Sequence, residues 1–448
     1  MEQQFPARNS LIKNDLEFKG LSYIEKAQTG FLIDLVKYAQ ARSPYYAKVL
    51  AKAGITGASI KKLSDLKKLP ITTKTHLQKD NLDFFCVDRD EMAEVVSTTG
   101  TTGDPVFIAL TKKDLERLSL NEVRSFRCAG AENSDIFHIA VTLDNLFMAG
   151  MAYYSGITRI GACVYRAGMS NVKKQVDLIQ RLRPSGIITV PSFLYRIIEV
   201  LKAEGIKKND LTIKKVLLVG ESIRDEKFKL NQLGKAISVD FPVELYSTYG
   251  NSECGISFCE CSAKKGGHEH SDLIISEILD DEGNVLPDGS LGELVMTTLQ
   301  VEGMPLIRYR TGDITFKIAG KCTCGRNSVR LGPILGRKAQ MMKFKGVKVY
   351  PMTIDNAVLS VKGVRNHIIE VFTGDDHSDK IVVKVGCGKK NQKLKKEIKQ
   401  IIQAHARVTP QIELLSVEEV EDLRTEKGTR RKMRTFIDNR KKTIVDGA

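Results

Sequence analysis

Tryptophan is absent from the 448 residues, and aromatic residues make up only 6% of them. So few aromatic side chains argue against a nucleic-acid reader built on stacked bases. No run of about 18 apolar residues occurs, which argues against a membrane span. Residues 1–20 lack the apolar stretch of a secretory signal. The sequence therefore predicts a soluble cytoplasmic protein that binds neither nucleic acid nor membrane.

The length and the charge bound the architecture and the partners. A chain of 448 residues, 42% of them apolar, is long enough for two or three domains with sizeable cores. Lysine and arginine number 69 against 54 acidic residues, which gives a net charge of +15. Residues 338–448 hold 24 of these basic and 14 of these acidic residues. The excess favours anionic partners, although a solvated lysine-rich surface would have the same composition.

Short β-rich runs alternate with amphipathic stretches between residues 135 and 250. The predicted strands are 135–141, 158–165, 186–190, 215–220 and 243–248, and the predicted helices are 171–183 and 192–205. This alternation predicts an α/β fold with a mostly parallel sheet flanked by helices. In such sheets, ligands bind at the loops that follow the carboxyl ends of the strands.

The remaining sequence predicts further sheets and a second domain. Residues 273–318 are strand-rich, with DDEGNV and PDGSLGE as turns. After Gly336 the pattern changes to a helix, two strands, a helix and a strand, expected at 353–361, 366–372, 380–386, 391–406 and 411–415. We therefore expect a large N-terminal domain, 1–336, and a small α+β domain, 337–448.

Three segments carry chemistry. In STTGTTGDP, residues 97–105, packed hydroxyls and glycines suit a loop whose N–H groups approach phosphate oxygens. In YGNSE, residues 249–253, a carboxylate beside a hydroxyl after a strand could hold Mg²⁺ and a phosphate. In YRTGD, residues 309–313, an Asp after a Gly turn could accept hydrogen bonds from the ribose hydroxyls. Arg337, which follows in the sequence, could reach the same sugar or its phosphate. Each segment alone could be a polar turn.

The order and spacing of these segments resemble the adenylate-forming superfamily, and within it the phenylacetate–CoA ligase-like branch. KYAQARSPYYAKVL at 37–50, LFMAG at 146–150 and RYRTGD at 308–313 support the same branch. The resemblance runs from about residue 30 to the end. It implies a large multi-sheet N-terminal adenylate-forming domain with a small C-terminal lid. It also implies a two-step reaction, in which ATP converts a carboxylic acid to an acyl-adenylate with release of pyrophosphate, and a thiol then takes the acyl group.

The resemblance assigns roles position by position. Glu253 matches the Mg²⁺ ligand, Tyr249 and Gly250 would flank the adenine, and Asp313 and Arg337 would hold the ribose. Ser252 replaces the usual Thr. The matched phosphate loop is Thr98, Thr99, Gly100, Thr101, Thr102 and Gly103. We count Glu221 among the nucleotide-binding residues, and Thr101, Glu253 and Lys432 as catalytic.

The catalytic lysine is expected in the C-terminal tail. In this superfamily a mobile C-terminal domain supplies a lysine to the α-phosphate. Lys432, upstream of Asp438-Asn439-Arg440, fits best, and Lys427 is the second choice. A solvated basic tail is the alternative interpretation.

Two departures from the family pattern stand out. Asp104 and Val106 flank Pro105, where related loops often have a lysine. Residues 338–340 read Lys-Ala-Gln, where related sequences have the hinge aspartate after Gly-Arg. Thiol transfer in this superfamily depends on rotation of the lid, so an altered hinge bears on the second step.

Cysteine and histidine spacing suggests a metal site. Nine cysteines, an odd number, in a chain without an export signal argue against a disulfide framework. Three thiolates and one imidazole would suit a structural zinc ion, and they come from Cys261, His268, Cys322 and Cys324. Cys259 and His270 are alternative ligands, and buried free thiols are the plainer interpretation. Some proteins of the branch resemble this arrangement, and zinc would join two loops without an open position for catalysis.

The sequence thus predicts an AMP-forming acid–thiol ligase that uses ATP, Mg²⁺ and coenzyme A. The alternative is an adenylating enzyme that loads its acid onto an acidic carrier protein, with the basic C-terminal domain as docking surface. By family analogy, residues 137–152 and 220–222 line the acid pocket. The apolar composition of the first segment suits an aromatic acid, although core packing would produce it too. A homodimer is left open.

Overall fold

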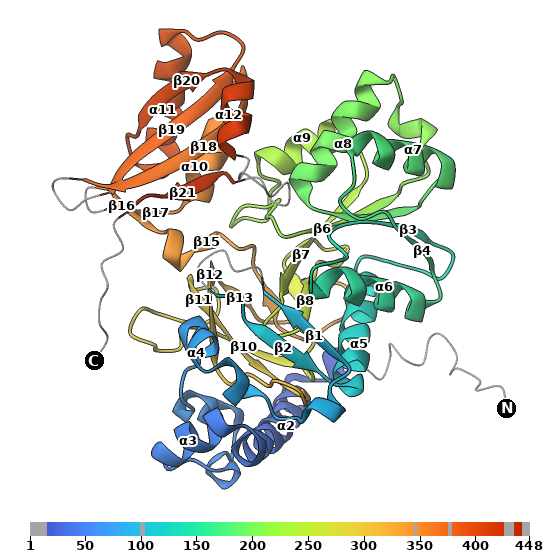
Figure 1. Ribbon diagram of the computed structural model, residues 1–448, viewed down its shortest axis with the longest axis vertical. Helices are drawn as coiled ribbons and strands as arrows, with labels where there is room; N and C mark the ends of the chain where they lie inside the picture. Colours follow the sequence, from blue (N-terminus) through green and yellow to red (C-terminus); the bar gives the residue numbers. More distant parts are fainter. Residues whose placement is uncertain (1–15, 99–103, 345–346, 375–378, 425–433, 441–448) are drawn as a thin grey trace. The chain divides into compact units, whose positions relative to one another are not determined.

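The computed structural model describes residues 16–98, 104–344, 347–374, 379–424 and 434–440 (Figure 1). The chain divides into two compact units. The larger unit comprises residues up to Lys229, together with 236–311 and 315–334. The smaller unit comprises 230–235, 312–314 and the residues from Leu335 onward.

A six-stranded sheet lies at the centre of the larger unit, in the order β4-β3-β5-β6-β7-β8. Its strands β3 to β7 are mutually parallel, as the sequence predicts, and only β8 is antiparallel. The strands are β3 (Ile136–Ala140), β4 (Cys163–Arg166), β5 (Gly186–Thr189), β6 (Lys215–Val219), β7 (Glu244–Asn251) and β8 (Ile256–Cys259).

Helices cover both faces of this sheet, and the strand pattern explains why. Successive side chains point to opposite faces, so Phe137 packs against Phe126 of α5 while its neighbour His138 contacts Gln175 of α7. Figure 1 shows α7 and α8 on one face and α6 on the other. The helices are α5 (Lys112–Cys128), α6 (Met148–Ile160), α7 (Val172–Leu182), α8 (Pro191–Ala203) and α9 (Gln232–Asp240).

One predicted strand is wrong in its first half. Residues 158–160 end helix α6, and only the later part of the predicted strand at 158–165 forms β4. Tyr153 and Ile157 of α6 are buried in the core beside Phe137, so packing favours the helix. Gly161, with φ +87, ends it in the left-handed conformation that glycine adopts most easily.

Smaller sheets and an N-terminal helical region complete the larger unit. The N-terminal elements are α2 (Leu21–Arg42), α3 (Pro44–Lys52) and α4 (Lys74–Lys79), preceded by the 3₁₀ turn Leu16–Phe18. An antiparallel ribbon joins β1 (Glu94–Ser97) to β2 (Phe107–Leu110). A short sheet has the order β13-β14-β9, made of Lys317–Ile318, Arg330–Leu331 and Gly267–His268. Another sheet contains β10 (Ile274–Leu279), β11 (Gly292–Thr298) and β12 (Tyr309–Thr315). Residues 312–314 of β12 and the short strand β15 (Gly336–Arg337) that pairs with them belong to the smaller unit.

The smaller unit is an α+β domain in which the five predicted elements lie within two residues of their predicted ends. Its sheet has the order β20-β19-β18-β21 and packs a core with α10 and α11. Its main elements are α10 (Pro351–Leu359), β18 (Val364–Thr373), β19 (Asp379–Cys387), α11 (Gln392–Ala406), β20 (Gln411–Leu415), α12 (Val417–Arg424) and β21 (Phe436–Asp438). Two short antiparallel strands, β16 (Met342–Phe344) and β17 (Val347–Val349), precede them.

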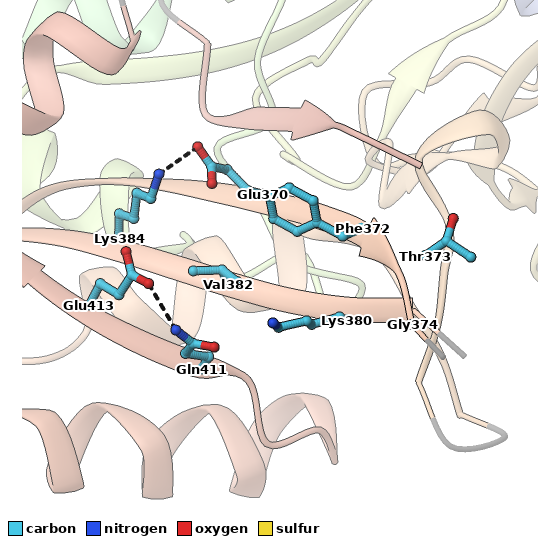
Figure 2. A pocket seen from close by; sticks show the side chains of 9 residues that line it. All are labelled: Glu370, Phe372, Thr373, Gly374, Lys380, Val382, Lys384, Gln411 and Glu413. Atoms are coloured by element: carbon cyan, nitrogen blue, oxygen red, sulfur yellow. Dashed lines mark hydrogen bonds and ion pairs between the residues drawn. The ribbon is translucent and has the colours of Figure 1, made fainter. Parts of the chain in front are cut away.

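The four-stranded sheet of the smaller unit carries a hollow of about 470 Å³. Ile369 and Val371 point into the core, so by strand alternation Glu370 and Phe372 point to the opposite face, where the hollow lies (Figure 2). Lys384 pairs with Glu370 at 2.9 Å there.

The predicted α/β fold class, with several sheets and a small C-terminal domain, is confirmed. None of the helices in the described ranges is long and apolar enough to cross a membrane.

Candidate functional site

The predicted phosphate loop joins strands β1 and β2. Thr98 stands at its start, where its N–H donates to Val106 O at 3.0 Å and its hydroxyl accepts from Val106 N at 3.2 Å. Helix α4 supports the other end, since Gln78 donates to Asp104 O at 2.8 Å. Residues 99–103, and with them the candidates Thr99, Gly100, Thr101, Thr102 and Gly103, lie outside the described residues.

The YGNSE segment forms the hairpin between β7 and β8. The sequence predicts that the strand ends at residue 248, which is wrong, because Tyr249 and Gly250 continue β7 and pair with β8. Ladder hydrogen bonds to β8 keep the strand extended beyond the parallel part of the sheet. Ser252 and Glu253 therefore stand in a tight turn, closed by Gly255 N donating to Ser252 O at 3.1 Å.

Two side chains from distant segments hold the Glu253 carboxylate. The hydroxyl of Tyr309 donates to Glu253 Oε1 at 3.2 Å. The ammonium of Lys74, at the first position of α4, lies 3.7 Å from the same oxygen. The Glu253 side chain is 11% exposed. The sequence names Tyr309 only as part of a motif and misses Lys74, for which Thr73 as a helix N-cap is the sole local signal.

A buried arginine fixes this turn from the core. Arg117 of α5 donates to three backbone carbonyls, those of Gly255 at 2.9 Å, Leu299 at 2.9 Å and Leu273 at 2.6 Å. Burial lowers the pKa of its guanidinium to about 10, so the group stays charged at neutral pH. The turn that carries Glu253 is thus tied to the neighbouring antiparallel sheet.

Glu221 follows β6 and contacts the start of helix α8. Its carboxylate accepts from Ser192 N at 3.0 Å and from Ser192 Oγ at 2.8 Å. A carboxylate at a helix N-terminus satisfies an otherwise unpaired N–H and opposes the positive end of the helix dipole. This contact gives Glu221 a structural role beside the nucleotide role predicted for it.

Asp313 and Arg337 are partners in the β12–β15 pair of the smaller unit. Arg337 Nε lies 3.2 Å from Asp313 Oδ1. Asp313 is buried, whereas the Arg337 side chain is 57% exposed. Residues 338–340, where related sequences have the hinge aspartate, form a 3₁₀ turn, and Arg440 donates to Ala339 O at 3.2 Å. The lysine candidates Lys427 and Lys432 lie outside the described residues.

The four predicted zinc ligands come together in the larger unit. The ligand atoms of Cys261, His268, Cys322 and Cys324 all lie within 4.8 Å of one another. Cys261 Sγ and Cys322 Sγ are 3.6 Å apart, close to the ~3.8 Å between two sulfurs bound tetrahedrally to one zinc ion at about 2.3 Å. His268 Nε2 lies 3.4 Å from Cys324 Sγ, while its Nδ1 lies 3.4 Å from Ser328 Oγ. The residues present fit a structural zinc ion.

The two alternative ligands belong to other contacts. The hydroxyl of Thr248 donates to Cys259 Sγ at 3.3 Å. His270 contacts Glu17 through Nδ1 and Ser125 Oγ through Nε2, the latter at 3.1 Å. Neither side chain is part of the four-residue cluster.

A buried carboxyl, that of Glu122, lies close to Ser125, because Ser125 Oγ is 3.0 Å from Ser257 Oγ, which contacts Glu122. Glu122 of α5 accepts from Ser257 Oγ at 2.9 Å and from Asn121 Nδ2 at 3.0 Å. Burial raises the pKa of the Glu122 carboxyl to about 7, and these two hydrogen bonds offset part of the effect. Glu122 is therefore protonated in the folded protein below neutral pH.

Known proteins match the chain along most of its length. A family model for AMP-binding enzymes matches residues 24–303, and one for the AMP-binding enzyme C-terminal domain matches 346–440. Phenylacetate-coenzyme A ligase of Thermus thermophilus is 34% identical over 357 residues, 78% of either chain. The Pseudomonas putida enzyme of the same name is 32% identical over 333 residues, 73% of either chain.

A solved structure shows the same fold. A 2-hydroxyisobutyryl-CoA ligase, in complex with an adenylate in its postadenylation state, superposes with a TM-score of 0.85 at 22% identity. The superposition covers 98% of this chain and 94% of that one. Fold and family together define an enzyme, an AMP-forming ligase of carboxylic acids. The chain belongs to the AMP-binding enzyme family, in its phenylacetate–CoA ligase-like branch, and the resemblance drawn from the motifs is confirmed.

Glu122→Gln should change how stability depends on pH. Burial raises the pKa from 4.5 to about 7, so the contribution of this carboxyl to stability is complete below pH 4.5 and is lost as pH rises to 7. An uncharged amide does not titrate in this range. The free energy of unfolding of the variant should therefore rise by about 3 kcal/mol relative to that of the wild type between these pH values. Unfolding midpoints across pH 4–8 measure this. Glu116→Gln, on the exposed face of the same helix, is the control, and an equal response of both variants would contradict the prediction.

Proposed function

We propose that this enzyme activates a carboxylic acid with ATP and Mg²⁺ and transfers the acyl group to coenzyme A. The first step forms an acyl-adenylate and releases pyrophosphate, and the second forms a thioester. The observation that carries the proposal is the AMP-binding match over residues 24–303, because it contains both Lys74 and the turn that carries Glu253. The phenylacetate-coenzyme A ligases of Thermus thermophilus and Pseudomonas putida support coenzyme A as acceptor.

Electrostatics explains why these residue types would be needed. Attack on the α-phosphate concentrates negative charge on the phosphate oxygens and the leaving pyrophosphate. Glu253 would hold Mg²⁺, which offsets that charge when bound, and Lys74 adds a positive charge beside it. Residues 98–103 would donate to the phosphates, and Ser252 would assist. Tyr249 and Gly250 would flank the adenine, with Glu221 nearby in the nucleotide site.

The domain roles and the ribose site are part of the same proposal. Asp313 would accept the ribose hydroxyls, and the exposed guanidinium of Arg337 would assist. Residues 1–336 would bind ATP and the acid, and residues 337–448 would act as a mobile lid that supplies Lys432. Thr101, Glu253 and Lys432 are the proposed catalytic residues.

An aromatic acid fits the available observations best. The curated relatives named above are phenylacetate-coenzyme A ligases. The segment 137–152 is largely apolar, and its residues Val141 and Met148 are buried. A screen of pyrophosphate release with aryl, aliphatic and amino acids tests this choice. Preference for a charged or small hydrophilic acid would contradict it.

Lys432→Ala should abolish adenylation and spare thiol transfer. A cation at the α-phosphate matters only while pyrophosphate leaves, and the loss of one such group costs about 10²–10³ in rate. Acid-dependent pyrophosphate release should fall by that factor, while transfer from supplied acyl-adenylate stays close to wild type. Lys427→Ala is the matched control. Equal loss in both steps shows that the role is misassigned, and normal adenylation moves the assignment to Lys427.

Coenzyme A should be the acceptor even though the C-terminal domain is strongly basic. The phosphates of coenzyme A would find many partners among the 24 basic residues after position 337. An acidic carrier protein would find the same charges. The measurement forms the acyl-adenylate in place, adds coenzyme A or candidate carriers, and follows the thioester by mass spectrometry. Efficient loading of a carrier without acyl-CoA would favour the adenylating enzyme instead.

The Cys261, His268, Cys322 and Cys324 cluster should hold about one zinc ion per chain, with a stabilising role. Elemental analysis of protein purified without added metal gives the stoichiometry. Cys322→Ser combined with Cys324→Ser should lose the metal and lower the unfolding midpoint. Cys163→Ser, an exposed cysteine outside the cluster, should keep it. A stoichiometry near zero, or full retention in the double variant, would remove the zinc site.

A further inference from the structure

An arginine contacts the metal cluster from outside its four ligands. Arg326 is 8% exposed and lies two positions after Cys324. Its Nη1 donates to Cys324 Sγ at 3.6 Å. Cys324 is the least buried of the three cysteines in the cluster, since Cys261 and Cys322 are buried and Cys324 is only partly so. The arginine therefore contacts the thiolate that water reaches most easily.

A carboxylate from the N-terminal segment holds this arginine in place. Glu17, in the 3₁₀ turn Leu16–Phe18, is fully buried. It accepts from Arg326 Nε at 2.6 Å and also contacts His270 Nδ1. The Arg326 guanidinium lies 4.8 Å from the centre of the Phe18 ring, within reach of a cation–π contact.

The backbone joins the same two segments. Asn327 N donates to Glu17 O at 2.7 Å, and the Asn327 amide donates to Lys19 O at 3.0 Å. The loop that carries Cys322 and Cys324 and the segment Leu16–Lys19 thus form one hydrogen-bonded unit. They are about 300 residues apart in the sequence.

The charges explain what Arg326 does there. Three thiolates around a divalent zinc ion leave a net negative charge, and a buried negative charge is costly without a partner. A guanidinium that donates to one thiolate offsets that charge and orients the ligand. Its fork geometry lets the Nε side meet Glu17 while an Nη meets Cys324.

We propose that Arg326, positioned by Glu17, retains the metal through its contact with Cys324, and that metal binding in turn orders the segment Leu16–Lys19. The inference rests on the zinc site proposed above and adds two residues to it. Arg326 and Glu17 are positioning residues, because neither contacts the metal itself. Outer-shell partners of this kind are worth about 10–100-fold in metal affinity.

The test measures metal release from the zinc-loaded enzyme into a chromogenic chelator. Arg326→Gln and Glu17→Gln should release zinc about 10–100-fold faster than the wild type. Arg326→Lys keeps the charge but loses the planar fork of the guanidinium. Its rate of zinc release should therefore lie between those of the two glutamine variants and that of the wild type. In the cobalt-substituted enzyme, Arg326→Gln should shift the thiolate-to-metal absorption band, which a general loss of stability would not do. Amide exchange at residues 16–19 should rise when zinc is removed.

Glu277→Gln is the matched control. It breaks a buried pair with Arg308, 2.9 Å long, that does not touch the cluster. It should leave the release rate, the absorption band and the exchange at residues 16–19 unchanged. Wild-type release rates in both Arg326→Gln and Glu17→Gln, with zinc present, overturn the inference and leave the zinc site standing. A wild-type enzyme that holds no zinc overturns both.

Discussion

The arrangement of the larger unit depends on the hydrogen bonds that the guanidinium of Arg117 makes. It is buried, and it meets the carbonyls of Gly255, Leu273 and Leu299 in three separate segments. A buried charge is tolerated only when it is fully hydrogen-bonded, so each carbonyl must stay within reach. The turn with Glu253 and the antiparallel sheet beside it are held at fixed separation as a result.

The N-terminal helices take their place from a second set of polar contacts. Thr72 pairs with Tyr309 across an isolated bridge, and its hydroxyl lies 2.9 Å from Tyr46 OH. These contacts set the start of α4, where Lys74 faces Glu253. A carboxylate that is mostly buried is stabilised by a nearby positive charge and by hydrogen-bond donors, and here Lys74 and the Tyr309 hydroxyl come from two segments far apart in the chain.

The Cys/His cluster likewise joins distant segments, in a part of the larger unit where the strands are short. Strands β9, β13 and β14 have two residues each, too few to stabilise their loops by ladder hydrogen bonds alone. Thiolates and an imidazole gathered within 4.8 Å offer the cross-link that such loops lack. Glu17 and Arg326 connect the same cluster to the segment Leu16–Lys19.

Most of the architecture could be predicted from the sequence because local patterns encode it. Alternation of strands and helices predicts the parallel sheet, and the five predicted C-terminal elements lie within two residues of their predicted ends, whereas the short elements β16, β17, α12 and β21 were not predicted. The exceptions arise where packing overrides the pattern. Residues 158–160 read as strand but complete α6 in the core, and β7 extends through Asn251 because β8 pairs with it.

The sequence by itself determined the family, the motif positions and the residue types of the candidate site, because the order of the motifs along the chain is a property of the chain alone. The partners of those residues were decided only by the tertiary structure. Nothing near Lys74 points to Glu253, and nothing near Glu17 points to Arg326, since each pair is made by segments that meet only after folding. Their geometry follows from the burial of apolar faces around them, and burial is a property of the whole fold.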